Sequence, residues 1–363
     1  MNSISAKTVV IVVALIVIIG GAAVFLTANN SDKGDNTLYE VIDATGNKIK
    51  LDVVPEKIIS LNALTTEAIC ELGLTSNIIG VTSDAGVHDV TNFIYGMDFD
   101  IEYPDQLKAQ IKSGKTALVG PSTSWSVEKV MTYDPDLVVF QTSADNLNKM
   151  ALLQEMGITC LVLNNNTYAT DVPGSIYENM EILGKALGKL DRAEMFNSNM
   201  KKTLDYIYAY CDGFKGKDVI TMAISGGSLF AYAGNNFKHV ILRELGCTTN
   251  MAGAATGVVS VENVLQYQPD IIIFSPGSFS EDILALKEQL EKDPLWADVK
   301  AMQNGEIYYL EYAARQSTSS LSHHFVHGVG LLATIVFDEI DIDVPQYVEE
   351  GKYLEYISWI DKK

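Results

Sequence analysis

The sequence predicts an α/β protein of two related lobes, because two blocks of sequence are repeated and because strand and helix patterns alternate. Residues 126–140 (SVEKVMTYDPDLVVF) and 260–274 (SVENVLQYQPDIIIF) are identical at eight of fifteen positions. A second pair, 71–80 (ELGLTSNIIG) and 244–253 (ELGCTTNMAG), precedes them in the same order. Two repeated blocks in one order indicate two copies of one structural unit, and we expect a ligand cleft between the resulting lobes.

The first part of the chain alternates short apolar runs with helical patterns. Residues 38–53 alternate around a Thr-Gly-Asn turn, which predicts a β-hairpin. Residues 57–61 and 77–81 predict strands, and residues 65–72 between them predict a helix that ends at Gly73. Strands that alternate with helices predict a Rossmann-like parallel sheet with helices on its faces.

Each copy of the fifteen-residue repeat predicts one helix-turn-strand unit. Ser126 and Ser260 are suited to cap the two helices. Pro135 and Pro269 end them, and the β-branched runs that follow predict buried strands. Residues 143–163 predict one further helix and strand in the first lobe.

The connection between the lobes has a different composition. Residues 175–210 contain no proline and are rich in Ala, Leu, Met, Glu and Lys, and the run from Asp191 to Tyr210 predicts one long rigid helix of ~20 residues, or ~30 Å, joining the lobes. Residues 218–224 begin the second lobe, 307–310 form its last clear strand and 321–337 its last long helix. The chain thus divides into a terminal apolar segment, a linker with the hairpin, the first lobe, the linking helices and the second lobe, at residues 1–30, 31–56, 57–174, 175–212 and 213–363.

Composition and charge exclude several classes of function. The chain of 363 residues has a formal net charge of −20, so it lacks the clustered Lys and Arg that nucleic acid requires. No GxSxG, HExxH or Walker sequence is present, which disfavours an extracytoplasmic enzyme. The four cysteines are far apart and form no CxxC pair, so disulfides stay an open question. We expect a monomeric binding protein that needs no cofactor.

The N-terminal segment predicts attachment to a membrane. Residues 9–26 are eighteen apolar residues in a row, close to the ~20 that span a bilayer. Lys7 precedes this run while Asp32 and Asp35 follow it, which places the rest of the chain outside the cytoplasm. We expect an uncleaved anchor in the cell membrane; a cleaved signal peptide, which would give a secreted protein, is the alternative. The first cysteine is Cys70, which excludes a lipid-modified N-terminal cysteine.

Taken in order, these sequences resemble one known family. The runs DATGNKIKL, PEKIISLNALTTEAICELGLTSNIIGVT and SVEKVMTYDPDLVVF are similar to the first lobe of ABC-transporter substrate-binding proteins of the iron-complex and cobalamin type. LGKALGKLDRAEMF resembles the start of that family's linking helix, while SVENVLQYQPDIIIF and PLWADVKAMQNGEIYYL resemble its second lobe. The resemblance spans residues 38–356. It implies a metal chelate as ligand (ferric siderophore, haem or cobalamin) and an ABC-transporter permease as partner.

The resemblance also implies that one glutamate of each lobe meets the permease. In this sequence those residues are Glu128 and Glu262, the third residue of each repeat. Both lie at a predicted helix start and off its buried stripe, so they are expected to face solvent. The alternative is that each carboxylate only complements the dipole of its helix.

Ligand contacts are expected from loops at the carboxyl ends of strands, where α/β sheets bind their ligands. The candidates are Asn62, Trp125, Tyr232, Tyr312 and Arg315. Trp125 and Tyr232 could offer a flat face to a large ligand, but each could equally pack within the core or its own loop. Arg315 is the arginine that lies in a predicted cleft loop, where it could clamp a carboxylate or phosphate; a loop salt bridge is the alternative.

Two features leave alternatives open. His323, His324 and His327 could bind a metal ion, since His323 and His327 are one helical turn apart. The run that follows is apolar and no carboxylate is evident nearby, so we expect no metal ligands here. A receptor for metal ions such as Zn²⁺ or Mn²⁺, and a surface sensor that does not transport, remain alternatives to the chelate-binding protein. Residues 84–118 form a long acidic insertion that could reshape the cleft entrance.

Overall fold

The computed structural model describes residues 39–83, 105–165, 171–225, 228–232, 236–249, 257–277, 282–319, 321–349 and 351–361. The chain divides into two compact units, Met1–Asn36 and Thr37–Lys363, and every described residue belongs to the second. The expected anchor at residues 1–30 and most of the acidic insertion lie outside the described residues. Among the helices that are described, none combines the length and apolar character needed to cross a membrane.

The first lobe begins with the expected hairpin and continues into a parallel sheet. Strands β1 (Tyr39–Ile42) and β2 (Lys48–Leu51) pair antiparallel, which confirms the hairpin. The five-stranded sheet has the order β5-β4-β3-β6-β7 and all its pairs are parallel. Its strands are β3 (Ile58–Ser60), β4 (Ile78–Val81), β5 (Ala117–Leu118), β6 (Leu137–Gln141) and β7 (Cys160–Leu163). Its helices are α2 (Ala63–Glu71), α3 (Asp105–Ser113), α4 (Val127–Met131) and α5 (Ala144–Glu155), with a 3₁₀ turn η1 (Thr75–Asn77).

The second lobe is built on a six-stranded sheet of order β10-β9-β8-β11-β12-β13. Its strands are β8 (Val219–Ser225), β9 (Ser228–Ala231), β10 (Gly257–Val258), β11 (Ile271–Pro276), β12 (Ile307–Leu310) and β13 (Tyr347–Val348). Strands β8, β11 and β12 are parallel as expected, and the short β13, which follows the strand expected to be the last, is parallel too. Strand β9 pairs antiparallel with β8 and β10. Only two residues separate β8 from β9, and a connection that short can join only antiparallel strands.

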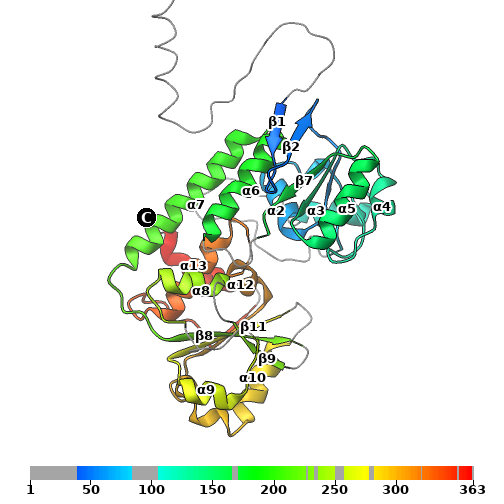
Figure 1. The fold of residues 1–363 in the computed structure, drawn as a ribbon. Coiled ribbons are helices and arrows are strands. Elements are labelled where there is room, and N and C mark those ends of the chain that lie inside the picture. Colours follow the sequence, from blue (N-terminus) through cyan, green and yellow to red (C-terminus); the bar gives the residue numbers. More distant parts are fainter. Residues whose placement is uncertain are drawn as a thin grey trace, which may run out of the picture. The chain divides into compact units, whose positions relative to one another are not determined.

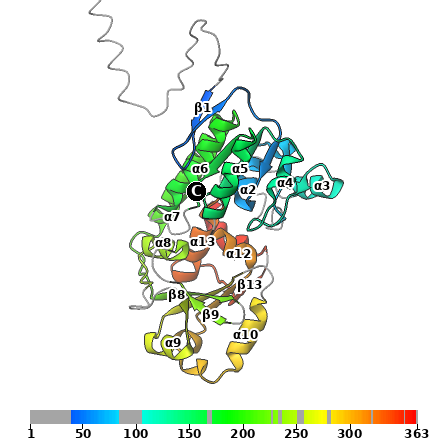
Figure 2. The same ribbon diagram turned by 45° about the vertical axis from the view of Figure 1, so that its right-hand side comes forward.

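Helices cover both faces of the second sheet, as Figure 1 shows: α8 and α13 lie on one side, α9 and α10 on the other. These helices, with the shorter α11 and α12, are α8 (Phe237–Glu244), α9 (Val261–Tyr267), α10 (Ile283–Lys292), α11 (Lys300–Gln303), α12 (Tyr312–Ser317) and α13 (Phe325–Val336). The 3₁₀ segments are η2 (Trp296–Asp298) and η3 (Tyr353–Asp361). Figure 2, turned by 45°, shows the same arrangement.

The two repeats fold alike. Ser126 caps α4 and Ser260 caps α9, the latter in a capping box with Asn263. After each helix the chain passes through a left-handed residue, Asp134 with φ 45° and Gln268 with φ 48°. These two residues occupy equivalent repeat positions, and within the described part of the chain they are the only non-glycine residues with positive φ. The repeat therefore encodes a complete helix-turn-strand unit, including its strained turn.

Two helices connect the lobes, and the second of them is the long helix that was expected. Helix α7 (Leu190–Tyr210) has the predicted length of about 20 residues, and α6 (Val172–Ala186) packs beside it. Gly184 of α6 allows this close approach, because a Cβ there would lie only 2.6 Å from Cβ of Ala193. Both helices supply side chains to both lobes. In the first-lobe core these are Met180, Leu183, Ala186, Ala193 and Phe196, and in the second-lobe core Val172, Ile176, Met200, Leu204 and Ile207.

Candidate functional site

A buried lysine marks the centre of the candidate site in the second lobe. Lys238, the second residue of α8, is 2% exposed. Its Nζ donates a hydrogen bond to Oγ of Ser275 at 3.0 Å and lies 5.5 Å from the centre of the Tyr232 ring. Loss of hydration, and secondly the charge of Arg315, lower the pKa of the Lys238 amine to about 7. The amine is therefore only partly protonated at neutral pH, and an anion bound beside it would favour its charged form.

Arg315 brings a second cation to the same place. Its guanidinium lies 5.4 Å from the centre of the Tyr312 ring and donates from Nη1 to Oε1 of Gln316 at 2.6 Å. The expectation that Tyr312 and Arg315 lie in a loop is wrong, because the chain turns directly after β12 into the short helix α12. Three of the five predicted ligand residues, Tyr232, Tyr312 and Arg315, are thus brought together around Lys238.

The electrostatics of this cluster favour an anion. Within the described part of the chain, neither Lys238 nor Arg315 forms an ion pair with a carboxylate. Ser275, which accepts from Lys238, is itself fully buried near the carboxyl end of β11. Two neighbouring cations without acidic partners, beside two half-buried tyrosines, can bind a carboxylate or another oxyanion through charge-assisted hydrogen bonds.

Sequence reasoning missed Lys238, and it placed two other residues differently from the structure. Trp125 is 2% exposed, and its indole nitrogen donates to Oδ1 of Asn146 at 3.0 Å, so the structure favours the core-packing alternative for this residue. Asn62 caps α2: its Oδ1 accepts from the backbone N–H of Leu64 at 2.9 Å. That oxygen is committed to the helix rather than open to a ligand.

The two glutamates proposed for docking have matching surroundings. Glu128 and Glu262 are both exposed in the first turn of their helices. The pKa of Glu128 is lowered by its own backbone N–H and by the Ser126 hydroxyl; that of Glu262 is lowered by the Ser260 hydroxyl and its own backbone N–H. Both side chains are therefore ionised at neutral pH, and each lobe presents one fixed carboxylate to solvent.

The three histidines are buried, and carboxylates face two of them. Nδ1 of His323 lies 2.9 Å from Oε2 of Glu71, and Nδ1 of His324 lies 2.6 Å from Oε1 of Glu67. Sequence inspection found no carboxylate near these histidines because the partners are 252 and 257 positions away, on α2 of the first lobe. His327 is fully buried, and burial followed by the nearby charge of His324 lowers its pKa well below the usual value.

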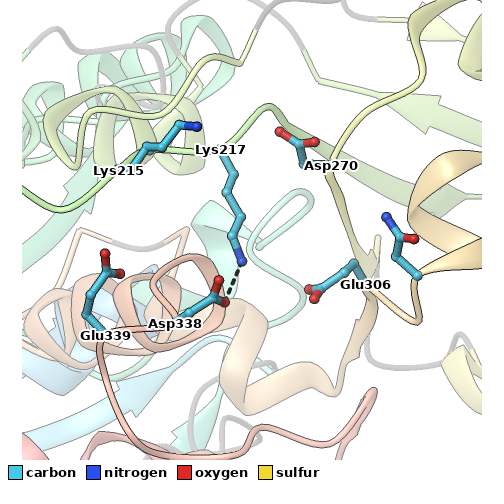
Figure 3. Close-up of a pocket in the computed structure, with 8 residues that line it drawn as sticks. Lys215, Lys217, Asp270, Glu306, Asp338 and Glu339 are labelled. Atoms are coloured by element: carbon cyan, nitrogen blue, oxygen red, sulfur yellow. Dashed lines mark hydrogen bonds and ion pairs between the residues drawn. The ribbon is translucent and has the colours of Figure 1, made fainter.

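A hollow of about 520 Å³ lies at the opposite edge of the second sheet (Figure 3). Three residues that line it, Lys217, Asp270 and Glu306, lie one or two positions before β8, β11 and β12. Nζ of Lys217 pairs with Oδ1 of Asp338 at 2.7 Å. Parallel sheets bind ligands at the carboxyl ends of their strands, whereas this hollow lies at the amino ends. Two lysines and four acidic residues line it, so it attracts an anion less than the Lys238 cluster does.

Comparison with known proteins agrees with this architecture. Residues 58–314, more than half of the chain, match the model of the periplasmic binding protein family. The chain belongs to this family. Among relatives of this periplasmic binding protein, the uncharacterized ABC transporter substrate-binding lipoprotein YvrC of Bacillus subtilis is 24% identical over 273 residues, covering 73% of this chain and 76% of the relative. The Fe(3+)-citrate-binding protein YfmC of the same organism is 21% identical over 282 residues, covering 77% and 81%.

Solved structures show the same fold. The siderophore-binding protein BauB, solved with two acinetobactin molecules and ferric iron, superposes on this periplasmic binding protein with a TM-score of 0.62 at 16% identity, covering 80% of this chain and 96% of BauB. The names of these three proteins describe binding: of the substrate of an ABC transporter for YvrC, of ferric citrate for YfmC and of a siderophore for BauB. The α/β fold of two lobes predicted from the repeats is thus confirmed.

Proposed function

We propose that this periplasmic binding protein is the extracytoplasmic substrate-binding subunit of an ABC importer and that its cargo is an anionic metal chelate. The observation that carries the proposal is the pair Lys238 and Arg315, two cations without acidic partners among the described residues of a chain whose net charge is −20. Ferric complexes of citrate and of many siderophores present carboxylates or other oxyanions, which such a pair recognises. The names of the relatives YfmC and BauB support this class of cargo.

The carrier role rests on the exposed carboxylates. Glu128 and Glu262 occupy the same position in both repeats, and each is held ionised beside a serine that caps its helix. A permease that offers one arginine to each lobe would form an ion pair with each of these carboxylates and so contact both lobes. The apolar run at residues 9–26 would hold the protein at the outer face of the membrane, because its eighteen residues approach the ~20 that span a bilayer.

Calorimetric titration tests the cargo. We expect the purified protein to bind ferric citrate or an anionic ferric siderophore more tightly than cobalamin, and to require Arg315. Arg315→Ala should weaken binding roughly tenfold or more, equivalent to ~1.4 kcal/mol. Arg243→Ala, which removes an exposed arginine from α8, is the matched control. Equal affinity of both variants for every chelate, haem included, would exclude Arg315 from the cargo site.

A further inference from the structure

We propose that the buried carboxylates and histidines between α2 and α13 form a divalent metal site that fastens the two lobes together. This site is separate from the cargo site, which lies around Lys238. Oxygen atoms of Glu67 and Glu71 and a ring nitrogen of His324 all lie within 4.8 Å of one another. Each of these three side chains belongs to a residue no more than 1% exposed. They combine two carboxylates and one imidazole, a donor set that suits Zn²⁺.

The helix geometry explains why the two carboxylates converge. Glu67 and Glu71 are four residues apart on α2, so they lie on the same face one turn apart. His324 is the N-cap of α13 and approaches this face from the second lobe. An ion bound by all three would therefore link an element of each lobe.

The hydrogen bonding of one carboxylate oxygen in this cluster is incomplete. Among the described residues, Oε1 of Glu71 is buried without a hydrogen-bond partner. A buried carboxylate oxygen that has lost its water without gaining a partner is costly, and a divalent cation would satisfy it. The same carboxylate offers its other oxygen, Oε2, to Nδ1 of His323.

The surrounding hydrogen bonds already orient this carboxylate. Asn197 donates from Nδ2 to the carbonyl oxygen of Tyr177 at 3.0 Å, so its Oδ1 faces Nε2 of His323 at 3.1 Å. His323 therefore donates from Nε2 to this oxygen, and the hydrogen bond between its Nδ1 and Oε2 of Glu71 requires a second proton, which either the ring or the carboxyl group carries. Carboxylates that bind a metal ion are themselves oriented by hydrogen bonds from neighbouring groups, and His323 would orient Glu71 in this way. His323 is thus a positioning residue and Glu71 a ligand.

Binding would replace a proton by the metal ion. The hydrogen bond of 2.6 Å between Nδ1 of His324 and Oε1 of Glu67 contains one shared proton. That proton leaves when the ion enters, because both atoms must then donate lone pairs to it, at about 2.0–2.2 Å each. Glu71 contributes Oε1 and keeps its bond to His323. No oxidant or reductant is involved.

The nearby charged groups are compatible with this arrangement. Arg192 directs its Nε to the backbone carbonyl oxygen of Glu71 at 2.5 Å, and its guanidinium lies 5.7 Å from the centre of the Phe196 ring. The ring centre of the buried His327 lies 5.2 Å from that of His324, so an imidazole rather than a charged chain packs against this ligand. Two carboxylates balance the charge of a divalent ion without help from either residue.

Metal retention tests the proposal. The purified protein is stripped with EDTA, loaded with Zn²⁺, freed of loosely held ions at high salt and analysed by mass spectrometry. We expect one zinc ion per chain and a melting temperature that rises by several degrees, because the ion binds only the folded state. Glu71→Gln should lose both effects, and Glu155→Gln, which changes an exposed glutamate of α5, should retain them.

A spectroscopic readout keeps the test valid if Glu71→Gln is less stable. Co²⁺ in place of Zn²⁺ should give the intense visible bands of a buried low-coordinate site, which surface carboxylates do not produce. His323→Gln should keep these bands and the stoichiometry of one but weaken affinity about 10–100-fold, as expected for a group that orients a ligand. Arg315→Ala should retain the zinc. The proposal is overturned if zinc washes out of the native protein, or if Glu71→Gln binds Zn²⁺ and Co²⁺ as the native protein does.

Discussion

Lys238 donates to Ser275 across 3.0 Å in a place from which water is excluded, with Arg315 as its neighbouring charge. A lysine amine in such surroundings is partly neutral at neutral pH. The protonation state of Lys238 therefore couples cargo binding and stability to pH in a range where ordinary lysines do not titrate.

The first prediction concerns stability. Because the pKa of Lys238 is about 7 in the folded protein and near 10.5 when unfolded, the unfolded chain binds more protons between these values. The free energy of unfolding should thus rise by about 2–3 kcal/mol from pH 7 to 9. Lys238→Met should lack this rise, and Lys202→Met, at an exposed position of α7, should keep it. Urea unfolding of the three proteins at both pH values measures the difference.

The titration of Lys238 should also change the affinity for the cargo. An anion bound beside Lys238 favours the protonated amine, so affinity for an anionic ferric chelate should fall as the pH rises above about 7. In Lys238→Met the affinity should be lower and nearly independent of pH. Parallel titrations from pH 6 to 9, with a chelate whose own charge is constant, provide the comparison. An unchanged pH profile in Lys238→Met would show that Lys238 does not contact the cargo.

The second lobe and the first lobe should contribute equally to docking. Glu128→Ala combined with Glu262→Ala is expected to leave chelate affinity intact and to abolish uptake into cells or reconstituted vesicles, since only the permease contact is lost. Each single variant should retain part of the uptake. Glu155→Ala and Glu244→Ala together form the control, because both glutamates are exposed but lie outside the repeat position. Normal uptake by the Glu128/Glu262 double variant would refute the docking role.

Trp125 should contribute to the stability of the fold and not to the affinity for the cargo. Trp125→Phe removes the hydrogen bond to Asn146 and part of the contact with Lys149, whose Nζ lies 4.8 Å from the ring centre. We expect a loss of about 1–2 kcal/mol in the free energy of unfolding, with chelate affinity unchanged. Denaturant unfolding and calorimetric titration of one protein preparation separate the two effects. A large fall in affinity without loss of stability would restore Trp125 to the ligand site.

A side chain at position 184 is expected to lower the stability of the protein. Its missing Cβ would lie 2.6 Å from Cβ of Ala193, so Gly184→Ala must push α6 and α7 apart. Overpacking of this kind costs about 1–3 kcal/mol. Ser198→Ala, at an exposed position of α7, controls for the added helix propensity. A thermal melt that shows Gly184→Ala as stable as the control would contradict the close packing.

Much of the fold was predictable because its signals are local. Strand and helix periods, the serine caps and Gly73, with φ 76° at the end of α2, are all encoded within a few residues. The short helix α12 was not predicted since six residues give no clear period, and the antiparallel β9 was not predicted because its four residues are too few to show a clear alternation.

The candidate site was predictable only in part, and the reason is packing at long range. Nothing in the run FKHVILRE distinguishes Lys238 from a solvent-exposed helix residue, since its burial depends on Ser275 and Tyr232, which come from other strands and loops. Likewise, the pairing of Glu71 with His323 depends on how α13 meets α2. No local pattern encodes such contacts.

Helices α6 and α7 each contribute side chains to the cores of both lobes, and this has a consequence for how the protein unfolds. Each helix places one half in the first-lobe core and the other half in the second-lobe core. Neither core can be completed while the other is open, so the lobes should form one cooperative unit. Calorimetry should therefore give one endotherm for the Thr37–Lys363 unit, and a fragment cut between α6 and α7 should fail to fold. The two lobes repeat parts of one sequence, yet they should fold and unfold together as one domain does.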